Sequence, residues 1–396
     1  MFRISKSALT FSFLLIIFIT IISCSSLPKK EIQDEKGSTK NVVQKIEIGN
    51  ELADRGELDS AIQIFTEVLL IYPNHSRTYY DRGRVYQMLN KNSEALDDYS
   101  TSIKLDSTFS RVYFYRGLIY DDMADYEKAI QDYIKLTELE PIYSRNYYNR
   151  AILYENVQEW EKAIDDYTTA ISINPNYESA FYNRGLLYKK QGKFTEALSD
   201  YSRSIQIDST KSDTYYNRGI LYVALDSLDK ALVDFSRAIE IHPLDCNALY
   251  NRALTLSLMG EKETALRDYT TVLNCDSLAA DAYYNRAILY GDFGDIESAI
   301  SDYTQAIEID SSYKNAFFNR ALLYDKLENY ENAFLDYNST IKIDPNYVGA
   351  YINRILLLGK LERFGEACQD CIKLHQLDPN HKLNEICEIV FSISKM

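Results

Sequence analysis

Amphipathic helical patterns fill the chain from residue 42 to residue 381. Apolar side chains recur three and four residues apart in stretches such as YYNRAILYENV (147–157) and EKAIDDYTTAISI (161–173), which is the spacing of one buried helix face. Short polar breaks separate the stretches. A proline ends one helix and favours the start of the next, and six of the seven prolines lie in these breaks: Pro73, Pro141, Pro175, Pro243, Pro345 and Pro379. The pattern therefore predicts paired helices and an all-α fold.

The same pattern returns every 34 residues with no insertion or deletion. With Ser76 taken as place 1 of a copy, a small residue recurs at place 8 from Gly83 to Ala321, and alanine recurs at place 20 from Ala95 to Ala367. Small residues at these places let two helices cross closely. One such hairpin is unstable alone and becomes stable when it is stacked on others.

A small residue at place 8, aromatic residues at places 11 and 24, alanine at place 20 and proline at place 32 together resemble the tetratricopeptide repeat. The resemblance implies a right-handed superhelical solenoid of about ten helical hairpins. Residues 42–75 form a first, degenerate copy, and nine further copies run from 76 to 381. We interpret residues 382–396 as a capping helix that covers the last apolar face.

Place 7 departs from the commonest form of the family, which has leucine there. Nine copies have arginine at this place, and each has aspartate sixteen residues later. If place 8 faces place 20, a long guanidinium reaches this carboxylate, either within a repeat or between repeats. We predict a structural ladder of ion pairs that specifies register more than stability. Its residues are Arg82, Asp98, Arg116, Asp132, Arg150, Asp166, Arg184, Asp200, Arg218, Asp234, Arg252, Asp268, Arg286, Asp302, Arg320, Asp336, Arg354 and Asp370.

In the family, the first helices of the hairpins line a concave groove. Place 6 is asparagine in seven successive copies, which resembles the asparagine ladder of O-linked N-acetylglucosamine transferases, and place 5 is aromatic. Amides and phenols suit the backbone of an extended peptide, so we predict a peptide-binding groove. The alternative is that the asparagines pack the hairpins or cap a neighbouring helix. The groove residues are Asn149, Asn183, Asn217, Asn251, Asn285, Asn319, Asn353, Tyr148, Tyr182, Tyr216, Tyr250 and Tyr284.

The first full copies are more basic on the predicted groove face. The family's carboxylate clamp, which binds chaperones, is not matched, because Asp81 and Tyr115 stand at place 6. Two interpretations stay open, a local anion-binding patch and a face that is merely solvated. The arginines concerned are Arg77, Arg84, Arg111 and Arg145.

The amino terminus has the order of a secretory signal. Two positive charges precede an apolar run from Ala8 to Ile22, and the run is shorter than the roughly 20 residues that span a bilayer. Its end at Ser23-Cys24 resembles the lipobox of bacterial lipoproteins, which implies a signal peptide at 1–23 and lipidation of Cys24. A signal anchor or a plain signal peptide is the alternative. Residues 24–41 are polar and predict a flexible tether, with a helical extension of the next element as the alternative that Pro28 and Gly37 disfavour. The predicted location is the bacterial cell envelope, facing the periplasm or the cell surface.

The net charge of the chain bears on the class of molecule that it binds. The chain has 43 basic and 58 acidic residues, a net charge of −15, which disfavours nucleic acid as a partner.

Cys246 and Cys275 lie at the two ends of one hairpin, where they form either a disulfide or buried thiols.

A second group of cysteines lies near the carboxyl terminus. Cys368, Cys371 and His375 share one helical face, with His381 and Cys387 nearby. Core packing against the capping helix is favoured, because the same places are mostly apolar or aromatic in other copies. A disulfide or a zinc site is the alternative.

No catalytic or phosphate-binding motif lies outside the repeat pattern. We therefore predict a non-catalytic scaffold without cofactor, metal or small-molecule substrate, anchored to the membrane by lipid. It is expected to bind protein partners as extended peptides or helices in the groove. A structural or self-associating envelope protein and a membrane-anchored co-chaperone are the alternatives.

Overall fold

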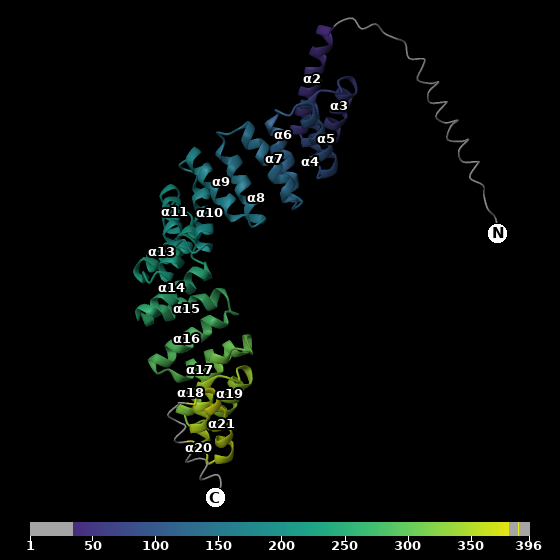
Figure 1. Ribbon diagram of the computed structural model, residues 1–396. Helices are drawn as coiled ribbons and strands as arrows, with labels where there is room; N and C mark the ends of the chain where they lie inside the picture. The colour runs from purple at the N-terminus through teal and green to yellow at the C-terminus, as the bar shows by residue number, and fades with distance from the viewer. Residues whose placement is uncertain (1–34, 380–386, 388–396) are drawn as a thin grey trace, which may run out of the picture. The chain divides into compact units, whose positions relative to one another are not determined.

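The computed structural model describes residues 35–379 and residue 387 (Figure 1). These residues form 20 helices, and no strand occurs among them. The predicted all-α fold of paired helices is therefore confirmed. The predicted signal peptide, Cys24 and the capping helix at 382–396 lie outside the described residues, except for Cys387, whose backbone is helical.

The helices belong to two compact units that divide between Gln158 and Glu159. In unit 1, purple to blue in Figure 1, each second helix packs on the first helix of the following copy. Its helices are α2 (Glu35–Asp54), α3 (Leu58–Ile71), α4 (Ser76–Met88), α5 (Asn92–Leu105), α6 (Ser110–Asp122), α7 (Tyr126–Leu139) and α8 (Ser144–Asn156).

Unit 2, teal to yellow in Figure 1, continues the same alternation of helices. Each hairpin within it packs on the next, so the apolar face of one copy is buried by its neighbour. Its helices are α9 (Trp160–Ile173), α10 (Glu178–Lys190), α11 (Phe194–Ile207), α12 (Ser212–Ala224), α13 (Leu228–Ile241), α14 (Cys246–Met259), α15 (Lys262–Cys275), α16 (Ala280–Phe293), α17 (Ile296–Ile309), α18 (Lys314–Lys326), α19 (Tyr330–Ile343), α20 (Val348–Lys360) and α21 (Phe364–Leu377).

The prediction of a flexible tether is wrong for residues 35–41. Helix α2 begins at Glu35 and includes Gly37, so it starts before the first repeat predicted at residue 42. Once packing fixes the helix that follows, each further residue costs little to add, and Glu and Lys are good helix formers. Polarity alone therefore did not mark the helix boundary.

The core forms where the two helices of a hairpin cross. A Cβ added to Gly219 in α12 would lie only 2.8 Å from Cε1 of Phe235 in α13. Ala231 and Phe235 are both fully buried. The close crossing expected from small residues at places 8 and 20 is thus present, and the aromatic residue at place 24 fills the space beside it.

Each hairpin turn contains one residue with a left-handed backbone. Glycine adopts this conformation freely, but other residues pay roughly 1–2 kcal/mol. Six of the ten positions are occupied by residues other than glycine, so the glycines in the sequence do not mark all of these turns. With φ between 54° and 83°, they are Gly56, Asn90, Ala124, Gln158, Gly192, Asp226, Gly260, Gly294, Glu328 and Glu362.

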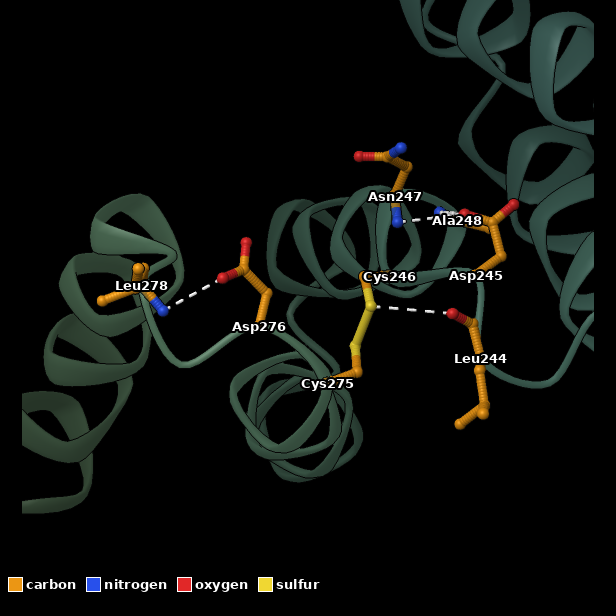
Figure 2. The surroundings of a disulfide bond; sticks show 8 residues. All are labelled: Leu244, Asp245, Cys246, Asn247, Ala248, Cys275, Asp276 and Leu278. Carbon is orange, nitrogen blue, oxygen red and sulfur yellow. Dashed lines mark hydrogen bonds between the residues drawn. A yellow bond between two sulfur atoms is a disulfide. The ribbon is translucent and has the colours of Figure 1, made fainter.

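A disulfide closes one hairpin of unit 2. Cys246 begins α14 and Cys275 ends α15, with their Cα atoms 6.5 Å apart (Figure 2). Cys275 is exposed, so the alternative of buried thiols does not hold for it. The disulfide can form because the antiparallel helices bring the start of the first helix beside the end of the second.

A second disulfide joins Cys371 of α21 to Cys387, with Cα atoms 5.6 Å apart. Both cysteines are buried in a cluster with Ile355 and Leu374. Core packing and disulfide formation, which the sequence presents as alternatives, therefore occur together. Cys368 is a free thiol.

Candidate functional site

The arginine at place 7 binds the aspartate at place 23 through two parallel hydrogen bonds. Arg218 Nε lies 2.7 Å from Asp234 Oδ2, and Arg218 Nη2 lies 2.8 Å from Asp234 Oδ1. The remaining nitrogen, Nη1, donates to Ser202 Oγ of the preceding copy at 3.1 Å. One arginine therefore links the two helices of its own hairpin and also reaches the neighbouring hairpin.

The same arrangement occurs in seven other copies: Arg82–Asp98, Arg116–Asp132, Arg184–Asp200, Arg252–Asp268, Arg286–Asp302, Arg320–Asp336 and Arg354–Asp370. Nη1 donates to place 25 of the preceding copy: Thr66, Ser100, Thr168, Ser236, Thr270, Thr304 and Asn338. The recurrent hydroxyl at place 25 was visible in the sequence, but its role was not recognised.

The remaining predicted pair has Arg150 in unit 1 and Asp166 in unit 2. Arg150 Nη1 donates to Thr137 Oγ1 at 2.7 Å. Place 25 of that copy is Ile134, which has no hydroxyl. Arg150 therefore uses a different hydroxyl of the preceding copy for the same kind of contact.

In these ion pairs the carboxylate is less exposed to solvent than the guanidinium. The side chain of Asp234 is 3% exposed and that of Arg218 is 17% exposed. Tyr215 and Tyr222 flank this guanidinium, each with its ring centroid 5.8 Å from Cζ. Burial raises the pKa of the Asp200 carboxyl, because lost hydration outweighs the arginine that faces it. This geometry supports an architectural role for the ladder.

The asparagines at place 6 form hydrogen bonds with the preceding copy. In four consecutive copies of unit 2, Nδ2 donates to the phenol oxygen at place 5 of the copy before. The pairs are Asn217–Tyr182 at 3.1 Å, Asn251–Tyr216 at 3.3 Å, Asn285–Tyr250 at 3.0 Å and Asn319–Tyr284 at 3.2 Å.

The other three asparagines of this row have acceptors of other kinds. Asn149 donates to Tyr133 and Asn183 donates to Tyr167, both at 3.3 Å and both to a phenol at place 24. Asn353 follows a copy with phenylalanine at place 5, and it donates to the Gly349 carbonyl at 2.8 Å. All seven amides are buried or half-buried. The row thus supports the alternative in which asparagine packs the repeats together; Tyr148, the remaining predicted groove tyrosine, is half-buried on α8.

The basic arginines of the first copies have different surroundings. Arg84 and Arg111 line a pocket of about 450 Å³ in unit 1. Arg77 lies outside its lining and forms an ion pair with Asp81 at 3.1 Å. Arg145 lies over the ring of Phe114, 5.8 Å from its centroid. The structure therefore brings together two of the four arginines that sequence analysis singled out.

The zinc alternative for the cysteine group finds no support in the described residues. Cys371 is bound in a disulfide, and no group of three His, Cys, Asp or Glu side chains in the described part of the chain is arranged to hold a metal.

None of the helices within residues 35–379 is both long and apolar enough to cross a membrane.

Comparisons with known proteins agree with the repeat assignment. A family profile described as TPR repeat matches residues 157–192. Profiles described as tetratricopeptide repeat match residues 110–143, 179–211, 212–244, 235–267, 280–313 and 315–347. The matched segments together cover more than half of the chain. Among curated proteins, no sequence match was found.

A solved structure gives the same fold, and two others are reported for their similarity in sequence. The C-terminal part of a TPR repeat-containing protein from Cytophaga hutchinsonii is 20% identical, with a TM-score of 0.51 over 59% of this chain and 95% of that chain. YrrB, a TPR protein with an unusual peptide-binding site, is 26% identical, with a TM-score of 0.44 over 46% and 95%. MamA is 24% identical, with a TM-score of 0.41 over 44% and 96%. By its repeat profiles and its stacked helical hairpins, the chain belongs to the tetratricopeptide repeat proteins.

Proposed function

We propose that this chain is a non-catalytic scaffold that binds protein partners through the first helices of its repeats. Tetratricopeptide repeats are typical of protein-interaction scaffolds. The observation that carries the proposal is a row of exposed polar residues at place 2, namely Asp213, Asn247 and Asp281, one per first helix and close in sequence to half-buried tyrosines such as Tyr216 and Tyr250. Polar groups beside aromatic rings suit an extended peptide or a helix.

Photo-crosslinking from defined positions tests this proposal. A benzophenone amino acid placed at Asp213, Asn247 or Asp281 should trap the same protein partner in intact cells. The matched control is Val233, which is 68% exposed on the second helix α13, and the same probe there should not trap that partner. Trapping from Val233 alone, or from no first-helix position, contradicts binding through the first helices.

The scaffold is proposed to stand at the bacterial cell envelope, anchored by lipid on Cys24. The charged and then apolar order of residues 1–23 supports export. The two disulfides within the described residues are also in keeping with an oxidising compartment. Radiolabelled palmitate should enter the wild-type chain and not a Cys24→Ser variant; equal labelling of both contradicts the anchor.

Self-association is the second candidate, and one observation favours it. Leu244 and Leu278 are 75% and 72% exposed, in successive turns on either side of the hairpin closed by the Cys246–Cys275 disulfide (Figure 2). Light scattering after size-exclusion chromatography should show an oligomer that a Leu244→Asn, Leu278→Asn variant loses. A wild-type monomer at high concentration excludes this candidate.

A further inference from the structure

Departures from the repeat pattern gather at the pocket of unit 1. Place 9 is leucine or isoleucine in the eight copies from 110 onwards, but it is Arg84 in the copy that begins at 76. Place 6 is asparagine in seven copies, but it is Tyr115 in the copy that begins at 110. Both residues line the pocket. Duplication copies a residue into every repeat, so it does not explain residues that differ from the pattern and meet at one point.

Place 2 shows the same asymmetry between the two units. It is arginine in the three full copies that start in unit 1, including Arg111 in the pocket. In unit 2 the same place contains no basic residue: Ser179, Asp213, Asn247, Asp281, Asn315 and Gly349. The positive charge at this place is therefore local, although the chain as a whole has a net charge of −15.

The two pocket arginines have no carboxylate partner at ion-pair distance among the described residues. Arg84 and Arg111 are both exposed, and neither forms an ion pair with any described residue. Burial raises the pKa of the Tyr80 hydroxyl to about 12, and the positive charges of Arg84 and Arg111 oppose this rise. Both arginines and Tyr80 line the same cavity.

The aromatic residues of the pocket orient one of these groups. The Arg84 guanidinium lies over the ring of Tyr115, 5.5 Å from its centroid, and Tyr115 packs edge-on against Tyr80 at 5.7 Å. A guanidinium stacked on a ring keeps its in-plane N–H donors available for a carboxylate. Phe114 and Leu136 add apolar surface to the lining.

The lining also contains one acidic group, which limits where a ligand can place its own charge. Glu140 accepts a hydrogen bond from Ser110 and one at 3.4 Å from Nδ2 of Asn146, which is only 6% exposed. Its carboxylate repels a second carboxylate placed beside it. An anionic group therefore fits beside Arg84 and Arg111, and a backbone N–H fits beside Glu140.

We propose that Arg84 and Arg111 bind the side-chain carboxylate of an aspartate or glutamate in an extended segment of a protein partner, with an apolar neighbour against Phe114 and Tyr115. The inference rests on the proposed scaffold function and gives its unit 1 a ligand class. A volume of about 450 Å³ lies within the usual size range of ligand pockets. The two unpaired guanidiniums supply the positive charge that an acidic ligand needs. Such charge is scarce elsewhere on this acidic chain.

The test uses acetylated nine-residue peptides with amidated carboxyl termini, so that every negative charge is on a side chain. Each peptide has Asp or Glu beside Phe, Tyr or Leu at a systematically varied position, and each has a twin with Asn or Gln. Fluorescence anisotropy with the full chain should find acidic peptides that bind at least tenfold more tightly than their twins. Their affinity should fall as salt is raised from 50 to 300 mM, while that of the twins should not.

Arginine substitutions locate the binding. Arg84→Gln and Arg111→Gln should each weaken the acidic peptides about tenfold and leave the twins unchanged. Arg267→Gln is the matched control, because Arg267 is exposed on α15 in unit 2. An unchanged thermal unfolding curve checks that the variants fold. If the variants fold poorly, the salt dependence of acidic-peptide binding to the wild-type chain still tests the inference.

Three results overturn the inference: no acidic peptide exceeds its twin by threefold, the arginine variants retain the preference, or only phosphoserine peptides bind. The crosslinks expected from Asp213, Asn247 and Asp281 come from unit 2 and do not depend on this pocket. Loss of the peptide preference with those crosslinks intact thus removes the inference and leaves the proposed function in place.

Discussion

Removing the arginine from one rung of the ladder should cost more stability than removing the whole rung. In Arg218→Ala, the carboxylate of Asp234 loses both of its charged hydrogen bonds at a site where its side chain is 3% exposed. Breaking a buried ion pair in this way costs about 3–5 kcal/mol. The double change Arg218→Leu, Asp234→Leu removes both charges. Its cost should be about 1 kcal/mol, from the lost contact between hairpins.

The equivalent rung formed by Arg184 and Asp200 should give this loss a pH signature, because burial already raises the pKa of the Asp200 carboxyl. Neutralising a carboxyl of ordinary pKa near 4 costs about 4 kcal/mol at pH 7 and about 1.5 kcal/mol at pH 5, which limits the loss. In Arg184→Ala the folded-state pKa of Asp200 should rise further above its unfolded value, because the arginine that opposes the rise is gone. The stability deficit is then complete above the folded-state pKa and shrinks as the pH falls towards the unfolded pKa. The double variant Arg184→Leu, Asp200→Leu has no carboxyl here, so it should lack this pH-dependent loss.

Urea denaturation followed by circular dichroism, at pH 7 and at pH 5, measures these differences. Urea is preferable to guanidinium because it does not screen the ion pair. Equal midpoint shifts for the single and double variants would refute the reasoning. So would a deficit of Arg184→Ala that is the same at both pH values, because the residual carboxylate of Asp200 would then not be its cause.

Three further outcomes are expected. Gly192→Ala should lower stability by about 1 kcal/mol, measured by urea midpoint, because φ there is 73° and no atom crowds the added Cβ; an unchanged midpoint rejects the strain. Tyr250→Phe and Asn285→Ala should each cost about 1 kcal/mol, and a double-mutant cycle should show that the two losses do not add. Cys246→Ser with Cys275→Ser should lower stability by up to about 3–4 kcal/mol by chain-entropy arithmetic for a separation of 29 residues, and faster amide exchange at the ends of α14 and α15 should accompany the loss.

The period of the sequence was enough to place the helices, because every copy solves the same packing problem. The helices expected at 147–157 and 161–173 are α8 at Ser144–Asn156 and α9 at Trp160–Ile173. The start of α2 and the left-handed turn residues were not foreseen. Both depend on backbone energetics that a polar stretch or a residue such as Ala124 does not display.

The candidate site was less predictable, because its residues acquire roles only when separate helices meet. Asn285 was equally compatible with binding a peptide and with packing its neighbour, and only the position of the Tyr250 phenol separates the two. Arg84 and Arg111 are 27 residues apart in the sequence, and their convergence requires α4 and α6 to be in place. The partner of Cys371 likewise depended on where Cys387 came to lie.

The contacts between neighbouring copies have a direction, and this has an evolutionary consequence. Arginine and asparagine on a first helix donate, and hydroxyls and phenols of the copy before accept, as in Arg218 with Ser202 and Asn251 with Tyr216. Most complete copies thus supply one donor side and one acceptor side at fixed positions. A gene built in this way can gain or lose whole copies in its middle by unequal recombination, and the new neighbours find matching groups without any compensating mutation.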